Sequence, residues 1–506
     1  MNDNTPVLVG CGQFTLRDGH GERSPVDLMA ETARMAGEDA GPGERLLREV
    51  DTLAVMGVIG WRYEDAPGLL SRQLGIDPRR RLYSSIGGNT PQWLVNRSCR
   101  EIERGDVGAV LITGAEALAS YKRANLDGRR LDWERGAGGD VEMIGDPRPG
   151  SSDHENAHGL MLPPTIYPLF ENALRARAGS DPGEHLRRLG ELYAPFSQLA
   201  SDNPLAWFRQ RRSAEEIATP AVSNRLIEWP YTKYMNAVLV VDQSASLILT
   251  SVGKARDLGI DESCWVFLHG CGDANDLWYV SERRDFCSSP ALAAAGQQAL
   301  AMAGVGIDDI DCFDLYSCFP SAVQIARNEL GIAEDDTRPL TVTGGLACHG
   351  GPGNNYTTHA IATLMQRARD KPDSLGLVSG LGWYMTKHSL GIYGATAPAG
   401  DTGGASLLHG EELAAELQQR LDAMEHPSLQ EQPEGSGSIE TYTIAFDRDG
   451  APESGIVVGR LDNGDRFLAR VASDPGLLAE LVEHEGVGRS GSVKPGGERG
   501  NVFTPD

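Results

Sequence analysis

Two segments of this chain follow the same plan, and this repetition constrains the fold more than any other feature of the sequence. Residues 85–117 read SIGGNTPQWLVNRSCREIERGDVGAVLITGAEA, and residues 347–383 read ACHGGPGNNYTTHAIATLMQRARDKPDSLGLVSGLGW. Each segment has a glycine-rich polar turn, then a helical stretch, then an apolar, strand-like run with glycine near its end. The repetition predicts an internally duplicated fold in which each half carries one such unit.

Strand-like runs alternate with helical patterns around these units, as in VDTLAVMGVIG (50–60) and CWVFLHGCG (264–272). Such alternation is typical of an α/β fold with buried strands. The pattern stops between about 120 and 235, where Arg, Pro, Trp and long helical stretches predict an inserted, mostly helical region that could cover a site. We assign 1–120 and 236–280 to the N-terminal half, 121–235 to the inserted loop domain and 281–425 to the C-terminal half.

The last 80 residues differ from the rest. Residues 426–437, HPSLQEQPEGSG, form a polar linker rich in Pro, Gly and Ser. Beyond it, alternating strands are joined by the turns DRDG and DNGD, which are typical of β-hairpins. We predict a small five-stranded barrel of the OB type for 438–506. An SH3-like barrel or a simple sheet is the alternative.

Charge and composition exclude several classes of function. The net charge of −25 would repel a phosphate backbone, so no nucleic-acid partner is expected. No apolar run reaches about 18 residues and the N-terminus does not resemble a signal sequence, so we expect a cytoplasmic protein without a membrane partner.

Motifs for metals and for tightly bound cofactors are missing from the sequence. Eight cysteines contain no CxxC pair and the histidines no HExxH motif. Asp153, His154 and His158 are the best candidate ligands, and we predict no metal. No Walker loop is present and the scattered GxG pairs are too weak to indicate a dinucleotide site, so we expect no permanently bound cofactor.

Several motifs occur in an order that resembles the thiolase superfamily: LVGCGQF, VNRSCREIERGDVGAVLITGAEAL, VVDQSASLILTSVGKARDLG, DLYSCFPSAVQIARNEL, TVTGGLACHGGPGNN and LGLVSGLGW. With its additional barrel the chain looks most like the thiolase-like proteins of type 1. The resemblance implies two βαβαβαββ halves in five α-β-α-β-α layers, with central helices that start at a shared active site. It also implies acyltransferase chemistry of lipid metabolism on a small-molecule acyl-CoA, with the CoA thioester as substrate, and a possible homodimer.

The residues that a thiolase uses are altered here. The family's nucleophilic cysteine corresponds to Gly88, and Cys99, eleven residues further along the same helix, would lie roughly 16 Å from the helix start. The catalytic histidine of the Gly-His-Pro turn corresponds to Gly351, although His349 stands two residues earlier. The second cysteine, which moves the substrate proton, corresponds to Ser379. Cysteine-dependent Claisen chemistry is therefore disfavoured.

Residues 316–319, Tyr-Ser-Cys-Phe, are similar to the His-Asp-Cys-Phe motif of sterol-carrier-protein thiolases. They also resemble the Tyr-Asp-Cys-Phe motif of the thiolase-like steroid side-chain aldolases, in which tyrosines drive a retro-aldol step. Those aldolases carry a His-Gly-Gly turn followed by a tyrosine, as His349 and Tyr356 do here. A tyrosine base needs a nearby cation or hydrogen bonds to lower its pKa, which His349 or His388 could supply; Lys387 is a weaker candidate because we expect it at the surface.

Three functions remain open: a thiolase-like enzyme that makes or breaks a carbon–carbon bond in a CoA thioester without the usual cysteine, a tyrosine-dependent retro-aldol lyase of a 3-hydroxyacyl-CoA, and a non-catalytic acyl-CoA-binding protein. Each candidate residue also has a structural alternative, such as a buried tyrosine ring or a thiol in the core. The predicted catalytic residues are Tyr316, Cys318, Cys348, His349, Tyr356 and His388, and the predicted substrate-binding residues are Gly88, Asn89, Ser317, Gly350, Gly351, Asn354, Ser379 and Gly380.

Overall fold

A computed structural model describes residues 2–17, 23–398, 406–472, 474–497 and 500–506. The first half builds a six-stranded sheet in the order β1-β8-β4-β2-β3-β5. Strands β4, β2, β3 and β5 are parallel, and β8 runs antiparallel to both of its neighbours. The strands are β1 (Pro6–Thr15), β2 (Thr52–Val55), β3 (Arg80–Ser84), β4 (Ala109–Ala117), β5 (Glu142–Ile144) and β8 (Asp242–Ser251).

The second half builds a four-stranded sheet in the order β10-β11-β12-β9. Its strands are β9 (Phe267–Asn275), β10 (Cys312–Asp314), β11 (Gly376–Gly382) and β12 (Lys387–Gly394). Because β9 pairs with β12, residues 267–280 belong with this half, and their assignment to the first half is corrected.

The βαβαβαββ order holds fully in the first half, whereas the second half lacks a regular third strand. The backbone N–H groups of Phe313 and Leu315 still donate to the carbonyls of Pro339 and Leu340, so this segment follows β10 for two residues. The next amide, that of Val342, donates instead to the Asp314 carboxylate at 2.9 Å. The side chain of Asp314 thus takes a donor that a continuing strand would need.

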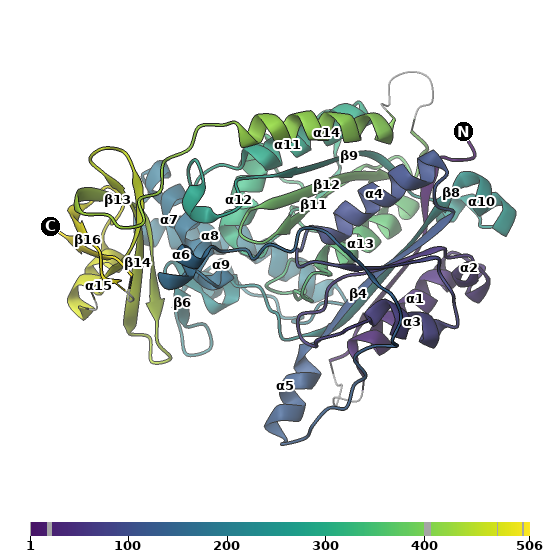
Figure 1. The fold of residues 1–506 in the computed structure, drawn as a ribbon, viewed down its shortest axis with the longest axis horizontal. Helices are drawn as coiled ribbons and strands as arrows, with labels where there is room; N and C mark the ends of the chain where they lie inside the picture. Colours follow the sequence, from purple (N-terminus) through teal and green to yellow (C-terminus); the bar gives the residue numbers. More distant parts are fainter. Residues whose placement is uncertain (1, 18–22, 399–405, 473, 498–499) are drawn as a thin grey trace.

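Helices complete the five expected layers. α4 (Thr90–Arg104) and α13 (Tyr356–Asp370) lie between the two sheets, as Figure 1 shows. α1 covers the outer face of the first sheet and α11 that of the second. The helices outside the central layer are α1 (Pro25–Asp39), α2 (Glu44–Arg48), α3 (Ala66–Leu74), α10 (Val252–Leu258), α11 (Pro290–Ala303), α12 (Pro320–Glu329) and α14 (Leu407–Asp422), with short 3-10 turns η2 (Glu262–Cys264), η3 (Val280–Glu282) and η4 (Ile307–Asp309).

Local sequence explains where the helices begin and end. Ser24 caps α1 in a capping box with Asp27, and Pro25 occupies the first helical turn. Gly105 ends α4 in the left-handed conformation at φ 80°. None of the helices in the described ranges is long and apolar enough to cross a membrane.

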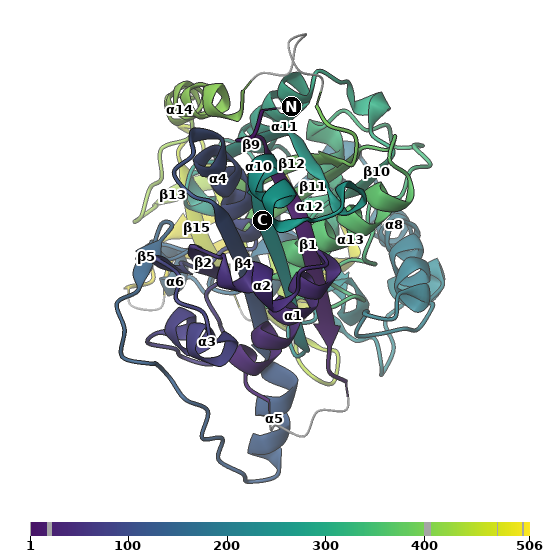
Figure 2. The same ribbon diagram turned by 90° about the vertical axis from the view of Figure 1, so that its right-hand side faces the viewer.

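Helices make up about half of the inserted region, the rest being turns, irregular chain and short strands, and α5 projects from the body of the molecule in both views (Figures 1 and 2). Its short strand β5 joins the first sheet, while β6 joins the sheet of the C-terminal barrel. The elements are α5 (Leu118–Leu126), α6 (Asp153–Ala157), α7 (Pro163–Ala178), α8 (Pro182–Asp202), α9 (Ala214–Ala218), β6 (Leu226–Glu228), β7 (Tyr231–Thr232) and the 3-10 turn η1 (Lys233–Met235).

The C-terminal region forms a closed barrel of five strands, and it lies at one end of the molecule (Figure 1). The strand order is β13-β14-β15-β17-β16, closed by β16 on β13, with β15 and β17 parallel. This closure confirms the small-barrel prediction and excludes a simple sheet. The elements are β13 (Gly435–Phe446), β14 (Pro452–Leu461), β15 (Arg466–Val471), α15 (Pro475–Glu483), β16 (Ser490–Lys494) and β17 (Val502–Pro505), so the barrel begins three residues before the predicted boundary.

Candidate functional site

The N-termini of the two central helices meet, as the resemblance to thiolases implied. The Thr357 hydroxyl of α13 donates to the carbonyl of Gly88 at 2.7 Å, just before α4. Asn354 accepts from the Gly87 amide at 2.8 Å and donates to the Gly57 carbonyl at 2.6 Å. The positive ends of two helix dipoles therefore lie at one junction between the halves of the molecule.

Tyr316 occupies the space in front of Gly88. A Cβ atom on Gly88 would lie 2.1 Å from the Tyr316 hydroxyl oxygen and 2.6 Å from the Leu381 carbonyl oxygen. The backbone N–H of Tyr316 donates to the Ser379 hydroxyl at 3.0 Å. The rings of Tyr316 and Tyr356 pack edge to face, with their centroids 5.5 Å apart. Among the described residues, none hydrogen-bonds to the Tyr316 hydroxyl. Burial raises the pKa of Tyr316, so this hydroxyl stays protonated.

The glycines at the junction allow close approach of the backbone. Gly380 passes so close to α4 that a Cβ there would lie 2.8 Å from Asn89 Cα. Gly350 has φ +110°, and a side chain on it would meet Gln243. The backbone N–H of Gly351, a predicted substrate contact, already donates to the Val238 carbonyl at 2.8 Å.

The turn that carries Cys348 and His349 is buried beneath the inserted region. The backbone amides of Trp207 and Phe208 donate to the carbonyls of His349 and Cys348 at 2.8 and 2.9 Å. Burial lowers the pKa of His349 to about 4 and raises that of Cys348 to about 11. At neutral pH the histidine is therefore uncharged and the cysteine is a thiol.

Tyr356 is held in a separate buried network. Its hydroxyl lies 2.7 Å from Thr343 Oγ1 and donates to Asp314 Oδ1 at 3.0 Å. Asp314 Oδ2 accepts from Thr341 Oγ1 at 2.9 Å. Burial raises the pKa of Asp314 to about 6 and that of Tyr356 well above its usual value. The hydroxyl of Tyr356 is therefore already engaged within the protein.

Ser317 and Cys318 lie between Tyr316 and α12, and both are buried. Ser317 Oγ accepts the Leu346 amide at 3.2 Å, and the Cys318 carbonyl accepts the Ala237 amide at 3.1 Å. Burial raises the pKa of Cys318 to about 12. Neither this thiol nor that of Cys348 has the lowered pKa of a nucleophile.

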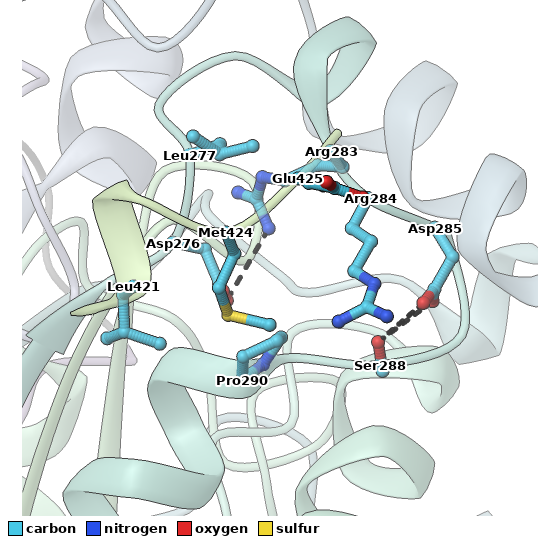
Figure 3. A pocket seen from close by; sticks show the side chains of 10 residues that line it. All are labelled: Asp276, Leu277, Arg283, Arg284, Asp285, Ser288, Pro290, Leu421, Met424 and Glu425. Carbon is cyan, nitrogen blue, oxygen red and sulfur yellow. Dashed lines mark hydrogen bonds and ion pairs between the residues drawn. The ribbon is translucent and has the colours of Figure 1, made fainter. Parts of the chain in front are cut away.

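His388 lies on the other face of the sheet, which corrects its placement among the candidates. Successive residues of a strand point to opposite faces. Ser389 accepts from Asn89 of the central layer at 3.2 Å. His388 Nε2 instead lies 3.0 Å from Oγ of Ser289, the residue that caps α11, and 3.5 Å from Asp276, which follows β9. Figure 3 shows Asp276 beside Arg283 at a small cavity on this outer side. His388 thus cannot act on Tyr316.

Lys387 faces the central layer instead and is buried, contrary to the expectation of a surface residue. Its ammonium donates to the Ile86 carbonyl at 2.5 Å, one turn before α4. Burial lowers its pKa to about 8. The alternation of residues 387–389 along a strand was the signal that could have placed it.

The groups at the junction suit a neutral, polar ligand atom. Tyr316, Cys318, Cys348 and His349 are all uncharged at neutral pH, and two helix N-termini offer partial positive charge. Within the described ranges, His, Cys, Asp and Glu form no group of three or more placed to hold a metal ion.

Two protein families match parts of this sequence. Residues 272–395 match the family described as "Thiolase C-terminal domain-like", and residues 416–498 match the family described as "Thiolase-like protein type 1 additional C-terminal domain". Together with the five layers and the paired helix N-termini, these matches define a protein of the thiolase superfamily.

A solved structure makes the assignment more specific. It is that of a monomeric SCP2-thiolase-like protein type 1 from Mycobacterium smegmatis, which is 36% identical and superimposes with a TM-score of 0.84. The match covers 100% of this chain and 99% of the other. The chain belongs to the thiolase-like proteins of type 1. Because that relative is described as monomeric, the homodimer stays a prediction.

Two curated relatives match over shorter stretches. The benzoylsuccinyl-CoA thiolase subunit BbsB of Thauera aromatica is 23% identical over 201 residues, 40% of this chain and 49% of the relative. A steroid side-chain-cleaving aldolase of Thermomonospora curvata is 27% identical over 180 residues, 34% of this chain and 45% of the relative. The chain spans less than half the length of these relatives.

Proposed function

We propose that this chain binds an acyl-CoA thioester at the junction of α4 and α13 and does not perform cysteine-dependent Claisen chemistry. The observation that carries the proposal is the Tyr316 hydroxyl, which fills the space that a side chain on Gly88 would need. A thiolase-type mechanism needs a thiolate at the start of this helix. The nearby thiols of Cys318 and Cys348 have raised pKa values instead.

A thioester carbonyl matches what the junction offers. The Tyr316 hydroxyl is a neutral donor without a hydrogen-bond partner in the described ranges, and the helix N-termini favour the partial negative charge of a carbonyl oxygen. General acid–base catalysis works best with a pKa near the working pH, and burial moves His349 and the tyrosines away from it. Binding is therefore better supported than turnover.

Calorimetric titration with CoA and with acyl-CoA esters of increasing chain length tests the proposal. Tyr316→Phe should weaken acyl-CoA binding about 2- to 10-fold, because one neutral hydrogen bond is lost, and should leave free CoA unaffected. Tyr121→Phe, on exposed α5, is the matched control. The proposal is refuted if no ester binds, or if the protein releases CoA from an ester and thiol alkylation stops that release.

A tyrosine-dependent retro-aldol lyase of 3-hydroxyacyl-CoA is the second candidate, favoured by the unpartnered Tyr316 hydroxyl and by the stretch similar to the steroid side-chain-cleaving aldolase. A base would take the proton of the 3-hydroxyl, the C2–C3 bond would break, and a carbonyl product would leave while the acyl-CoA enolate took up a proton.

Product analysis after incubation with a 3-hydroxyacyl-CoA separates this candidate from simple binding. The lyase predicts a shortened acyl-CoA and a carbonyl product in equal amounts, and loss of both with Tyr316→Phe. The same turnover in wild type and variant would exclude tyrosine chemistry, whereas bound but intact ester favours the binding function.

A further inference from the structure

A second cavity, of about 300 Å³, opens on the side of α4 where Lys387 lies. It is bounded by β12, the end of β9, the first turn of α4, the loop after β5, and α14. α14 contributes the uncharged Ala414 and Gln418, and Trp93 and Trp278 supply aromatic edges. Arg148 lies over the Trp278 ring at 3.9 Å from its centroid. A volume near 300 Å³ is at the lower end of the range for small-molecule sites.

Lys387 is a buried cation that forms no ion pair with any residue the structure describes. The chain has six lysines, all within the described ranges, and Lys387 is the one that is buried, with its residue 7% exposed. Its ammonium has three donors, donates to the Ile86 carbonyl and lies 5.8 Å from the centroid of the Trp278 ring. Buried charges in proteins are normally paired, so this one lacks a counter-ion. The six are Lys122, Lys233, Lys254, Lys371, Lys387 and Lys494.

The acidic residues of the cavity wall are already paired with arginines. Arg148 donates to Asp146 at 2.6 and 2.9 Å, and Arg100 lies 3.1 Å from Asp273. No carboxylate of the described residues is within ion-pair distance of Lys387. Among the described residues, Lys387 therefore has only a distant carboxylate, that of Asp146, and the Trp278 ring near its charge.

A second unpartnered group lies beside Lys387. Asn89 is buried, its Nδ2 donates to Ser389, and its Oδ1 has no hydrogen-bond partner in the described part of the chain. A Cβ on Gly87 would lie 2.6 Å from Asn89 Oδ1 and 2.7 Å from Lys387 Nζ, and a Cβ on Gly382 would lie 2.3 Å from Asn89 Oδ1. Two glycines therefore leave room where a cation and a free acceptor come close together.

We propose that this cavity is a second binding site, separate from Tyr316, for a small 2-hydroxycarboxylate. The carboxylate supplies the missing counter-ion of Lys387, and the hydroxyl donates to Asn89 Oδ1. The apolar part of the ligand lies against Trp93 and Trp278. The proposal does not depend on acyl-CoA binding at the junction.

Proton uptake should accompany binding. Burial lowers the pKa of Lys387 to about 8, with Asp146 opposing this shift and Arg148 adding to it. His388 also borders the cavity, and its Nε2 lies 3.0 Å from Ser289 Oγ on the α11 side. A bound carboxylate favours the charged amine, so near pH 8 the complex takes up protons. Affinity should fall as the pH rises above 8, because the free amine loses its charge.

Calorimetric titration with lactate and mandelate tests the site, in two buffers of different ionisation enthalpy at pH 8. Acetate lacks the hydroxyl and benzyl alcohol lacks the carboxylate, so both should bind at least tenfold more weakly than mandelate. Lys387→Met keeps the apolar stem and should weaken mandelate binding about tenfold to a hundredfold. Lys254→Met is the matched control, since its ammonium already pairs with Glu49 at 3.0 Å.

Asn89→Asp is a second variant of nearly unchanged size that places a carboxylate next to Lys387. It should abolish mandelate binding, and circular dichroism shows whether either variant is folded. The proposal is overturned if wild type binds neither hydroxy acid, if binding survives in Lys387→Met within twofold, or if no protons are taken up at pH 8.

Discussion

Replacing Gly88 by alanine tests whether Tyr316 fills the space at the start of α4. The new Cβ would lie 2.1 Å from the Tyr316 hydroxyl oxygen, 2.5 Å from Cζ of the same ring and 2.6 Å from the Leu381 carbonyl oxygen. Non-bonded carbon contacts normally lie near 3.5–4.0 Å, so the ring must shift by more than 1 Å. The ring is buried and packs against Tyr356, and such a shift would disturb that contact.

We expect Gly88→Ala to lower the free energy of unfolding by about 3 kcal/mol, the upper end for overpacking, because one of the clashing atoms belongs to the backbone. Gly351→Ala is the matched control at the same junction. Its Cβ would lie 3.2 Å from the flexible end of Leu346, and we expect a loss below about 1 kcal/mol.

A double-mutant cycle separates the ring from the backbone clash. Tyr316→Ala alone should cost about 3–5 kcal/mol through the cavity it leaves. In Gly88→Ala/Tyr316→Ala the new methyl group enters that cavity, so the double variant should lose about 2 kcal/mol less than the sum of the single losses. Equilibrium urea unfolding followed by circular dichroism measures all four proteins. A loss below 0.5 kcal/mol for Gly88→Ala, or an additive double variant, would refute the assignment of this space to Tyr316.

Two further predictions concern the attachment of the barrel. Burial raises the pKa of Glu228 from 4.5 to about 7. Between these pH values the folded protein keeps a proton that the unfolded chain has released. The free energy of unfolding therefore falls as the pH rises from 4.5 to 7. Glutamine does not titrate, so the free energy of unfolding of Glu228→Gln relative to wild type should rise by about 3 kcal/mol from pH 4.5 to 7, as measured by urea unfolding. The same difference between the two proteins at every pH would contradict this. The Arg466 side chain is fully buried and donates to Glu440 of the barrel at 2.6 and 2.8 Å and to the Ser281 carbonyl of the body. Arg466→Met should therefore lower the free energy of unfolding by about 3–5 kcal/mol and make the barrel susceptible to limited proteolysis. Arg460→Met, which removes a partly exposed partner of the same Glu440, should cost below about 1 kcal/mol; equal proteolysis of the two variants would show that Arg466 does not anchor the barrel.

Local periodicity predicted the α/β alternation, the internal duplication and the small barrel, whereas the five layers were implied by the resemblance to thiolases. Alternating strands and helices, two repeated glycine turns and two hairpin signals indicated two related α/β halves and a β-rich C-terminal domain, and the structure confirms both. The boundary at 267–280 could not be read in this way. β8 and β9 are both apolar runs, and only their hydrogen-bond partners assign them to different sheets.

The orientation of strand residues was the main error at the site. A strand in the core presents Lys387 and His388 to opposite faces, and different helices cover the two faces of this sheet. Counting residues along β12 would have placed Lys387 beside α4 and His388 beside α11. Deciding which of the two residues faces α4 still required knowing which helix covers each face of the sheet.

Gly88 and Tyr316 make sense only as a pair, and this is why residue-by-residue comparison describes the site incompletely. In the sequence alone, Gly88 was predicted to replace a nucleophilic cysteine, and Tyr316 was interpreted as an altered motif position. In the structure, the Tyr316 hydroxyl fills the space that a side chain on Gly88 would need, although 228 positions separate the two residues in the sequence. A cysteine at position 88 would bring the same Cβ atom into the ring of Tyr316, so restoring a thiolase-like nucleophile would require both residues to change together.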